Sequence, residues 1–144
     1  MARIVQKFGG TSLADPASRE SLVKKAQAAR LAGDQIILVV SAMGRRGDPY
    51  ATDTLLDLLT AFPGGGDGLT KDLMASCGEV ISACVIAALL NSKGIPAEPM
   101  AAPSAGIAAS GEFGDASVLP IDPSKVEAVR SEERRVGKEC RSRW

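Results

Sequence analysis

A lysine that stands two residues before a pair of glycines offers the clearest chemistry in the sequence. The stretch consists of Lys7, Phe8, Gly9, Gly10, Thr11 and Ser12. Glycine lets the backbone approach an anion closely, and N–H groups at the start of a helix attract negative charge. The stretch therefore suits a phosphate group, although a strand that ends in a tight turn would use the same residue types. It matches neither the Walker A loop nor the dinucleotide-binding fingerprint.

The absence of histidine from the sequence narrows the possible chemistry further. A Ser-His or Cys-His nucleophile is excluded, so catalysis must use lysine, arginine, carboxylates, hydroxyls, backbone N–H groups or a bound hard metal. The three cysteines, Cys77, Cys84 and Cys140, form no Cys-x-x-Cys pair, which argues against a structural zinc site or a disulfide framework. Cys77 and Cys84 lie two helical turns apart in an apolar segment and are predicted to be small core residues.

A strand–helix–strand pattern is expected to position Lys7. Residues 3–8 are β-prone, Asp15-Pro16 is typical of a helix start, and Gly33 is typical of a helix end. Residues 35–40 form an unbroken apolar run, which predicts a strand of a parallel sheet that is buried on both faces. Both glycine-containing turns then follow the carboxyl ends of strands, where open α/β sheets bind their ligands.

The rest of the chain continues this pattern and predicts an α/β protein with a mostly parallel sheet and helices on both faces. The further elements expected are a short helix capped by Thr52 or Asp53, a long helix over 69–91, strands over 95–100 and 117–120, and a helix after Asp122-Pro123. The predicted apolar face of the long helix comprises Leu73, Met74, Cys77, Val80, Ile81, Cys84, Val85, Ala88 and Leu89.

Size and charge are those of one ordinary globular domain. The chain has 144 residues, 45% hydrophobic and only 3% aromatic, which suits a layered α/β core. No run is expected to reach the ~20 apolar residues of a membrane span, and no signal peptide is recognised, so a cytoplasmic location without membrane contact is predicted. The net charge is zero, but residues 130–144 carry six basic and three acidic residues, which leaves residues 1–129 at −3. The main body therefore shows no nucleic-acid footprint.

Residues 1–129 resemble the amino-terminal part of the catalytic domain of bacterial aspartate kinases, in the amino-acid kinase family. The blocks that carry the resemblance are residues 7–12, 39–44, 48–56 and 76–79, with weaker likeness at 105–106 and 113–116. The resemblance implies a three-layer αβα sandwich with a mostly parallel sheet, of the carbamate kinase-like type, here truncated.

The resemblance also implies an activity. Enzymes of this family are transferases that move the γ-phosphate of ATP, with Mg²⁺, to the side-chain carboxylate of L-aspartate and give 4-phospho-L-aspartate. This step begins lysine, threonine, methionine and diaminopimelate biosynthesis, and the complete enzymes are cytoplasmic homo- or hetero-oligomers. The implied catalytic residue is Lys7, which would neutralise the phosphoryl group in transit. The implied ATP-phosphate contacts are Lys7, Phe8, Gly9, Gly10, Thr11 and Ser12.

The family's aspartate-binding positions fall on Ser41, Thr52 and Glu79, and Glu79 would meet the substrate's ammonium group. No metal ligand is implied among the residues of this chain. The chain departs from the family at Ala102, Pro103 and Ser104, where glycine and glutamine are usual, and the family's nucleotide-binding half lies beyond residue 129. We therefore expect this chain alone to be inactive.

Residues 130–144 match no block of the family and resemble the translation of a common DNA-sequencing adapter. They are predicted to be a non-native, disordered tail, because they are highly charged and lack apolar periodicity. Residues 1–129 are then the whole of the family-like region.

Two other functions stay open. The chain could come from another amino-acid kinase of the same fold, acting on glutamate or N-acetylglutamate, but the blocks at 51–56 and 76–79 argue for aspartate. It could also be a non-catalytic module that binds an amino acid or pairs with a complete subunit, which predicts stabilisation by aspartate without turnover.

Overall fold

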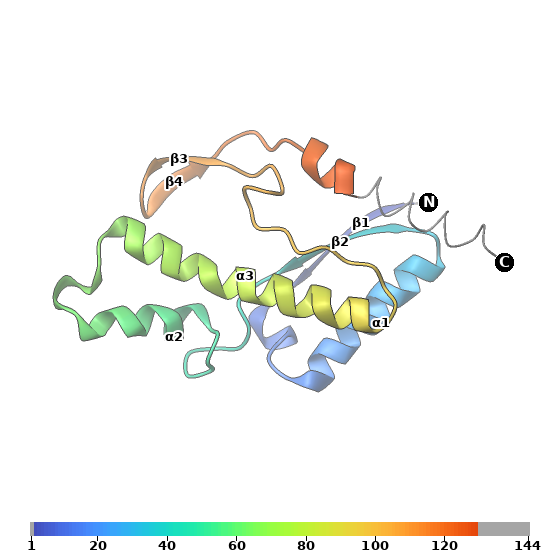
Figure 1. The fold of residues 1–144 in the computed structure, drawn as a ribbon, viewed down its shortest axis with the longest axis horizontal. Coiled ribbons are helices and arrows are strands. Elements are labelled where there is room, and N and C mark those ends of the chain that lie inside the picture. The colour runs from blue at the N-terminus through green and yellow to red at the C-terminus, as the bar shows by residue number, and fades with distance from the viewer. Residues whose placement is uncertain (1, 130–144) are drawn as a thin grey trace. The chain divides into compact units, whose positions relative to one another are not determined.

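Two parallel strands and the helix between them form the beginning of the chain. The structure is a computed structural model that describes residues 2–129 and divides the chain into two units, Met1–Pro99 and Met100–Trp144 (Figure 1). Strand β1 (Arg3–Phe8) pairs in parallel with β2 (Gln35–Val40), with Lys7 opposite Val39, and helix α1 (Pro16–Leu31) connects them. The predicted βαβ unit is therefore present, and a short 3₁₀ turn (Gly10–Ser12) follows β1.

Helix α1 begins and ends as its sequence predicts. The Asp15 carboxylate accepts a hydrogen bond from the Ser18 N–H at 2.8 Å, and Pro16 occupies the first helical position. The hydrogen bonds that Ser18 donates lower the pKa of Asp15. Gly33, with φ +76°, ends the helix, since the Asp34 N–H bonds back to the Ala29 carbonyl at 3.0 Å. The spacing of Leu22, Val23, Ala26 and Ala29 in the sequence predicts that they share one apolar face of this helix, and all four are buried.

Helix α3 (Gly68–Ser92) is the longest element, and it extends one residue beyond the predicted range of 69–91 at each end. The Asp67 carboxylate accepts a hydrogen bond from the Thr70 N–H at 2.8 Å. The Thr70 side chain and this N–H together lower the pKa of Asp67. Gly94, with φ +71°, ends the helix through a 3.0 Å bond from the Ile95 N–H to the Leu90 carbonyl. The guanidinium of Arg30, near the end of α1, donates to the Gly94 carbonyl at 2.7 Å, so the ends of α1 and α3 are joined.

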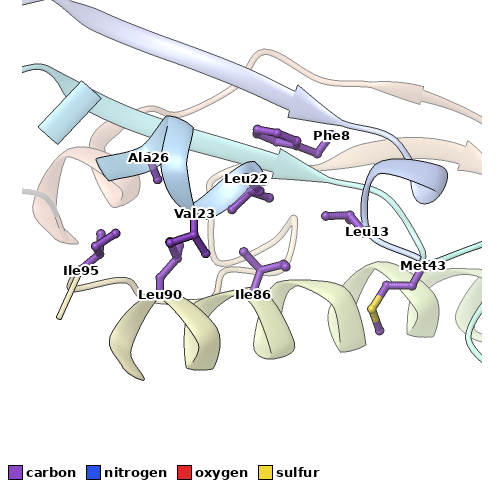
Figure 2. Packing of buried hydrophobic residues seen from close by; sticks show 9 residues of the cluster. All are labelled: Phe8, Leu13, Leu22, Val23, Ala26, Met43, Ile86, Leu90 and Ile95. Atoms are coloured by element: carbon purple, nitrogen blue, oxygen red, sulfur yellow. The ribbon is translucent and has the colours of Figure 1, made fainter. Parts of the chain in front are cut away.

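The hydrophobic core of the first unit lies between α1 and α3 and reaches the end of β1. Figure 2 shows Leu22 and Val23 of α1 facing Ile86 and Leu90 of α3. The full cluster is Phe8, Leu13, Leu22, Val23, Ala26, Met43, Ile86, Leu90 and Ile95. Met43 belongs to the loop after β2, so this core fixes that loop relative to α3.

The prediction of which face of α3 is buried is wrong. The buried residues are Gly78, Ser82, Ile86, Ala87 and Leu90. The predicted residues Leu73, Cys77, Val80, Cys84, Val85 and Ala88 are exposed. Apolar residues occur around the whole circumference of this helix, so their spacing does not select one side. The two cysteines are therefore surface residues and not part of the core.

Length and composition alone would also allow α3 to cross a membrane. Its most apolar 18-residue window has a mean hydropathy of 2.1, and 28% of that window is buried. The expectation that no apolar run reaches this length is therefore wrong. The observation is weak evidence for a membrane span, because core helices of soluble proteins have the same properties, and one row of α3 residues packs in the core.

Strand β2 differs from its prediction, because it is not buried on both faces. Its residues are half-buried, apart from Val39, which is exposed. In the described part of the chain β2 has β1 as its only neighbour, so it is an edge strand rather than a central one. Residues 95–100, predicted as a further strand, are irregular there. A short apolar segment becomes a strand only when a partner satisfies its N–H and C=O groups.

A loop and a short helix separate β2 from α3. Helix α2 (Thr52–Asp57) continues as 3₁₀ turns at Leu58–Ala61 and Pro63–Gly65. The prediction that Thr52 or Asp53 caps this helix is wrong, because Ala51 holds the cap position and no side chain bonds there. Thr52 is instead the first helical residue.

The second unit contains an antiparallel hairpin of β3 (Ala109–Glu112) and β4 (Asp115–Val118). Gly114, with φ +84°, makes the two-residue turn possible. The strand predicted over 117–120 overlaps β4 but lies in this separate sheet, because its partner is the adjacent β3. Residues 124–129 are helical, and the Asp122 carboxylate accepts from the Ser124 N–H as a helix start requires. The tail predicted over 130–144 lies outside the described residues.

Candidate functional site

The two glycine-containing turns after β1 and β2 lie against each other. The Gly44 N–H donates to the Gly10 carbonyl at 3.0 Å, and the Ser41 N–H donates to the Phe8 carbonyl at 3.1 Å. A Cβ at Gly10 would lie 2.5 Å from the Ala42 carbonyl oxygen and 2.6 Å from that of Gly44. Only glycine fits at position 10, so this residue is what allows the two turns to meet at one end of the strands.

Glu79 joins α3 to the second of these turns. Its Oε1 accepts a hydrogen bond from the Ala42 N–H at 3.2 Å, across 37 residues of sequence. The neighbouring Gly78 packs directly on Ala42. The long helix therefore places a carboxylate beside the loop that follows β2, and this bond uses only one of its two oxygens.

Helix α2 holds the other side of the same loop. The Arg46 guanidinium lies 3.2 Å from Asp57 Oδ1 and 3.9 Å from Asp53 Oδ2. The Gly47 N–H donates to the Thr54 hydroxyl at 2.9 Å. These contacts attach the loop to α2 and bring the beginning of that helix, with Thr52, next to Glu79.

These contacts border an open pocket of about 590 Å³ on the first unit. Its lining residues are Gly10, Ser41, Ala42, Gly44, Arg45, Arg46, Ala51, Thr52, Asp53 and Glu79. Four predicted site residues thus come together here, although they are spread over 70 positions of the sequence: Gly10, Ser41, Thr52 and Glu79. Sequence reasoning did not predict Arg45 or Arg46 as site residues, and their signal was the charged, glycine-containing loop over 44–48. Asp53 was considered only as a helix cap.

The other predicted phosphate-binding residues do not line this pocket. Lys7 is exposed on the opposite face of β1 from Phe8, as strand alternation requires. Phe8 is a core residue, and the Lys25 ammonium lies 5.5 Å from the centre of its ring. Thr11 is exposed. Phe8 and Ser12 border a second, smaller hollow of about 160 Å³.

The space beside Gly9 is compatible with an anion. Apart from the neighbouring residues of the chain, no atom lies within 4 Å of the position that a Cβ on Gly9 would take. A phosphate group thus has room near the backbone of Gly9, two residues after the exposed Lys7. Within residues 2–129, no group of three or more Cys, Asp or Glu side chains is placed to hold a metal ion.

Comparison with known proteins relates this chain to a family. The amino acid kinase family model matches residues 2–136, which extends past the boundary at residue 129 that the sequence suggested. The chain is 38% identical over 129 residues to aspartokinase 1 of Bacillus subtilis, covering 90% of this chain and 32% of that protein. It is 34% identical over 128 residues to aspartate kinase of Pseudomonas fluorescens, covering 88% of this chain and 30% of that protein.

A solved structure is similar as well. The crystal structure of aspartate kinase from Synechocystis matches with a TM-score of 0.55 and 29% sequence identity, over 65% of this chain and 15% of that one. The chain spans about a third of the length of the curated relatives that it matches. The likeness therefore concerns one portion of those proteins.

Proposed function

The chain belongs to the amino acid kinase family, and from this premise we propose that it carries the aspartate-binding part of an aspartokinase. The complete enzyme would transfer the γ-phosphate of ATP to the side-chain carboxylate of L-aspartate and form 4-phospho-L-aspartate. The observation that supports this most is the single pocket shared by Gly10, Ser41, Thr52 and Glu79. The names of the relatives favour aspartate over glutamate or N-acetylglutamate as the acceptor.

In this proposal the pocket recognises the amino acid by charge and hydrogen bonding. Glu79 has one oxygen available beyond its bond to the Ala42 N–H, and this oxygen would accept from the substrate's ammonium group. Ser41 and Thr52 lie on the same pocket and supply hydroxyl groups that can donate or accept. A buried polar group on a substrate is recognised strongly because leaving its partner unpaired is costly.

The phosphate side of the reaction would use the turn after β1. Phosphoryl transfer depends on positioning and on neutralising charge, and it needs no nucleophile from the protein. Lys7 is a cation suited to that charge, and the open space beside Gly9 would admit a phosphate group close to the backbone. ATP would enter as its Mg²⁺ complex, whose metal neutralises phosphate charge when bound. The described residues offer no metal cluster of their own.

The remaining properties follow from family membership and belong to the complete enzyme. We propose a cytoplasmic transferase that acts as a homo- or hetero-oligomer at the start of lysine, threonine, methionine and diaminopimelate biosynthesis. Neither a nucleic acid nor a membrane is a proposed partner. This chain, at about a third of its relatives' length, is proposed to bind aspartate without turning it over.

Titration calorimetry of the purified 144-residue chain tests the aspartate pocket. L-Aspartate should bind more tightly than L-glutamate or N-acetyl-L-glutamate, and Glu79→Gln should weaken aspartate binding about tenfold or more through loss of a charge-assisted hydrogen bond. Glu98→Gln is the matched control, since it removes the same charge from an exposed site of the same unit outside the pocket. Equal affinity for the three ligands, or an unchanged affinity in Glu79→Gln, would contradict the proposal.

A further inference from the structure

Arg45 lies on the wall of the pocket with its backbone held on both sides. Its N–H donates to the Asp48 carboxylate at 2.8 Å, and its carbonyl accepts from the Asp48 N–H at 2.8 Å. The preceding Gly44 has φ +87°, and a Cβ there would collide with the Asp48 side chain. The turn around Arg45 is therefore confined to one backbone conformation.

The side chain of Arg45, by contrast, is not engaged. Within residues 2–129 its guanidinium makes no hydrogen bond or ion pair, and it is exposed. Its neighbour Arg46 lines the same pocket, but Asp53 and Asp57 already pair with it. Arg46 thus holds the loop on α2, whereas all the N–H donors of the Arg45 guanidinium are available for a binding partner such as a ligand.

The chemistry of a guanidinium defines what that partner can be. Its planar fork of N–H groups matches the two oxygens of a carboxylate or of a phosphate, and it stays protonated at all ordinary pH values. The pocket also carries Glu79, so it offers one available cation and one available carboxylate oxygen. Such a pair suits a ligand with both an ammonium group and an anionic group, or two ligands that bind side by side.

We propose that Arg45 is an anion-binding residue of this pocket, which takes a carboxylate or phosphate oxygen of a substrate. The two candidate sources are a carboxylate of the amino acid and a phosphate of the nucleotide. The proposal rests on the proposed function for the identity of these substrates. It adds a residue that would orient them, and the rigid turn at Gly44 and Asp48 explains how an exposed arginine is positioned.

The test observes the Arg45 side chain directly in the 144-residue chain. Arginine labelled with ¹⁵N gives one Nε–Hε signal per residue, and the Arg45 signal is assigned by its loss in Arg45→Gln. L-Aspartate and inorganic tripolyphosphate are added separately. We expect the Arg45 signal to shift in a saturable way with at least one probe, and Arg45→Gln to weaken binding of that probe about tenfold or more. Arg45→Lys should restore part of the affinity, because it keeps the charge but not the fork.

Lys24→Gln is the control for net charge, because Lys24 is exposed on α1 outside the pocket, and this variant should bind both probes as the unaltered chain does. A shift with aspartate alone identifies a carboxylate, and a shift with tripolyphosphate alone identifies a phosphate. Should Arg45→Gln not fold, Arg45→Lys assigns the signal instead. If neither probe moves the Arg45 signal, the proposal is overturned. Aspartate binding that depends on Glu79 but not on Arg45 would reject this role and leave the proposed function intact.

Discussion

Gly78 of α3 and Ala42 of the loop after β2 are in direct contact. A Cβ built on Gly78 would lie 2.6 Å from the Ala42 Cβ and 3.1 Å from the Tyr50 carbonyl oxygen. Glu79 follows Gly78 and bonds to the Ala42 N–H at 3.2 Å. The closeness of helix and loop at this point is what lets the Glu79 carboxylate reach the loop.

Replacing Gly78 by alanine should therefore destabilise the chain, although alanine is the better helix former. Alanine in a helix gains about 1 kcal/mol over glycine, but overpacking costs about 1–3 kcal/mol, so we expect a net loss of about 1 kcal/mol in the free energy of unfolding. Urea unfolding of the 144-residue chain measures it. Ala42→Gly in the same chain should recover part of the loss, and an increase in stability for Gly78→Ala alone would show that the contact is not tight.

Lys7→Ala should affect phosphoryl transfer rather than aspartate binding. Lys7 is exposed and does not line the pocket that contains Glu79, so its removal should leave aspartate affinity unchanged in the 144-residue chain. In a complete enzyme kcat should fall strongly, about a hundredfold or more, because the charge that Lys7 meets develops during the reaction. Steady-state kinetics checks this, and an unchanged kcat would remove Lys7 from the proposed mechanism.

The two helix-capping aspartates should make stability depend on pH in the acid range. Hydrogen bonds from Ser18 and Thr70 lower the pKa values of Asp15 and Asp67 below their ordinary value of 3.8. A carboxyl group whose pKa is lower in the folded state stabilises it above the unfolded pKa, and this stabilisation disappears as the pH falls through the folded pKa.

Asparagine can cap a helix but does not titrate in this range. The double variant Asp15→Asn/Asp67→Asn should therefore lose less stability than the unaltered chain between about pH 5 and pH 2, measured by urea unfolding. Glu98→Gln, which removes an exposed carboxyl group that caps no helix, should follow the unaltered chain closely. Identical pH profiles for all three proteins would indicate that the caps do not titrate differently on folding.

Cys77 and Cys84 should react with thiol reagents in the folded protein. Both side chains are exposed on α3, on the side away from its buried row. The experiment uses the Cys140→Ser variant, so that Cys77 and Cys84 are the only thiols. Ellman's reagent should modify both thiols at similar rates in native buffer, and these rates should lie within about an order of magnitude of the rates in urea. Protection of either thiol until unfolding would mean that this side of α3 is covered in solution.

The 144-residue chain should show no aspartate kinase activity. An in-line transfer requires the acceptor carboxylate and the γ-phosphate to be held together. The chain covers about a third of the length of its relatives. A coupled assay with L-aspartate and MgATP measures turnover, and the Lys7→Ala variant gives the background. Turnover that disappears in Lys7→Ala would show that this portion suffices.

Local signals predicted α1 well but not the orientation of α3. Asp15, Pro16 and Gly33 set the limits of α1, and its four buried apolar residues stand on an otherwise polar helix, so one face was unambiguous. Asp67 and Gly94 set the limits of α3 equally well. Its exposed Leu73 and its buried Ile86 are both apolar, and only the position of α1 decides which of them is covered.

Strand pairing was harder to predict, because it depends on neighbours. β1 and β2 pair as predicted, since a helix of suitable length connects them. Residues 95–100 have a similar apolar character but find no partner among the described residues, whereas β4 pairs with a segment that lies next to it in sequence. The Phe113-Gly114 turn was the available signal for that hairpin.

The residues predicted to bind aspartate line one pocket, whereas most of those predicted to bind phosphate do not. Ser41, Thr52 and Glu79 line one pocket because the Ala42–Glu79 hydrogen bond holds the loop to α3 and the Gly47–Thr54 hydrogen bond holds it to α2. Lys7 and Gly9 lie within three residues of Gly10 in sequence, yet neither of them lines that pocket, and Lys7 is exposed on β1. The role of Arg45 was not predictable, because only the pairing of Arg46 with α2 distinguishes the two arginines.

The bond from Arg30 to the Gly94 carbonyl links the ends of two helices that are 64 residues apart in sequence. Helix ends normally fray independently, and their amide hydrogens exchange rapidly with solvent. Here the last turn of α1 supplies the donor that occupies the carbonyl just beyond α3, so opening one end releases the other. Amide exchange at Gly33 and Gly94 should therefore slow together in the unaltered chain and accelerate together in Arg30→Gln.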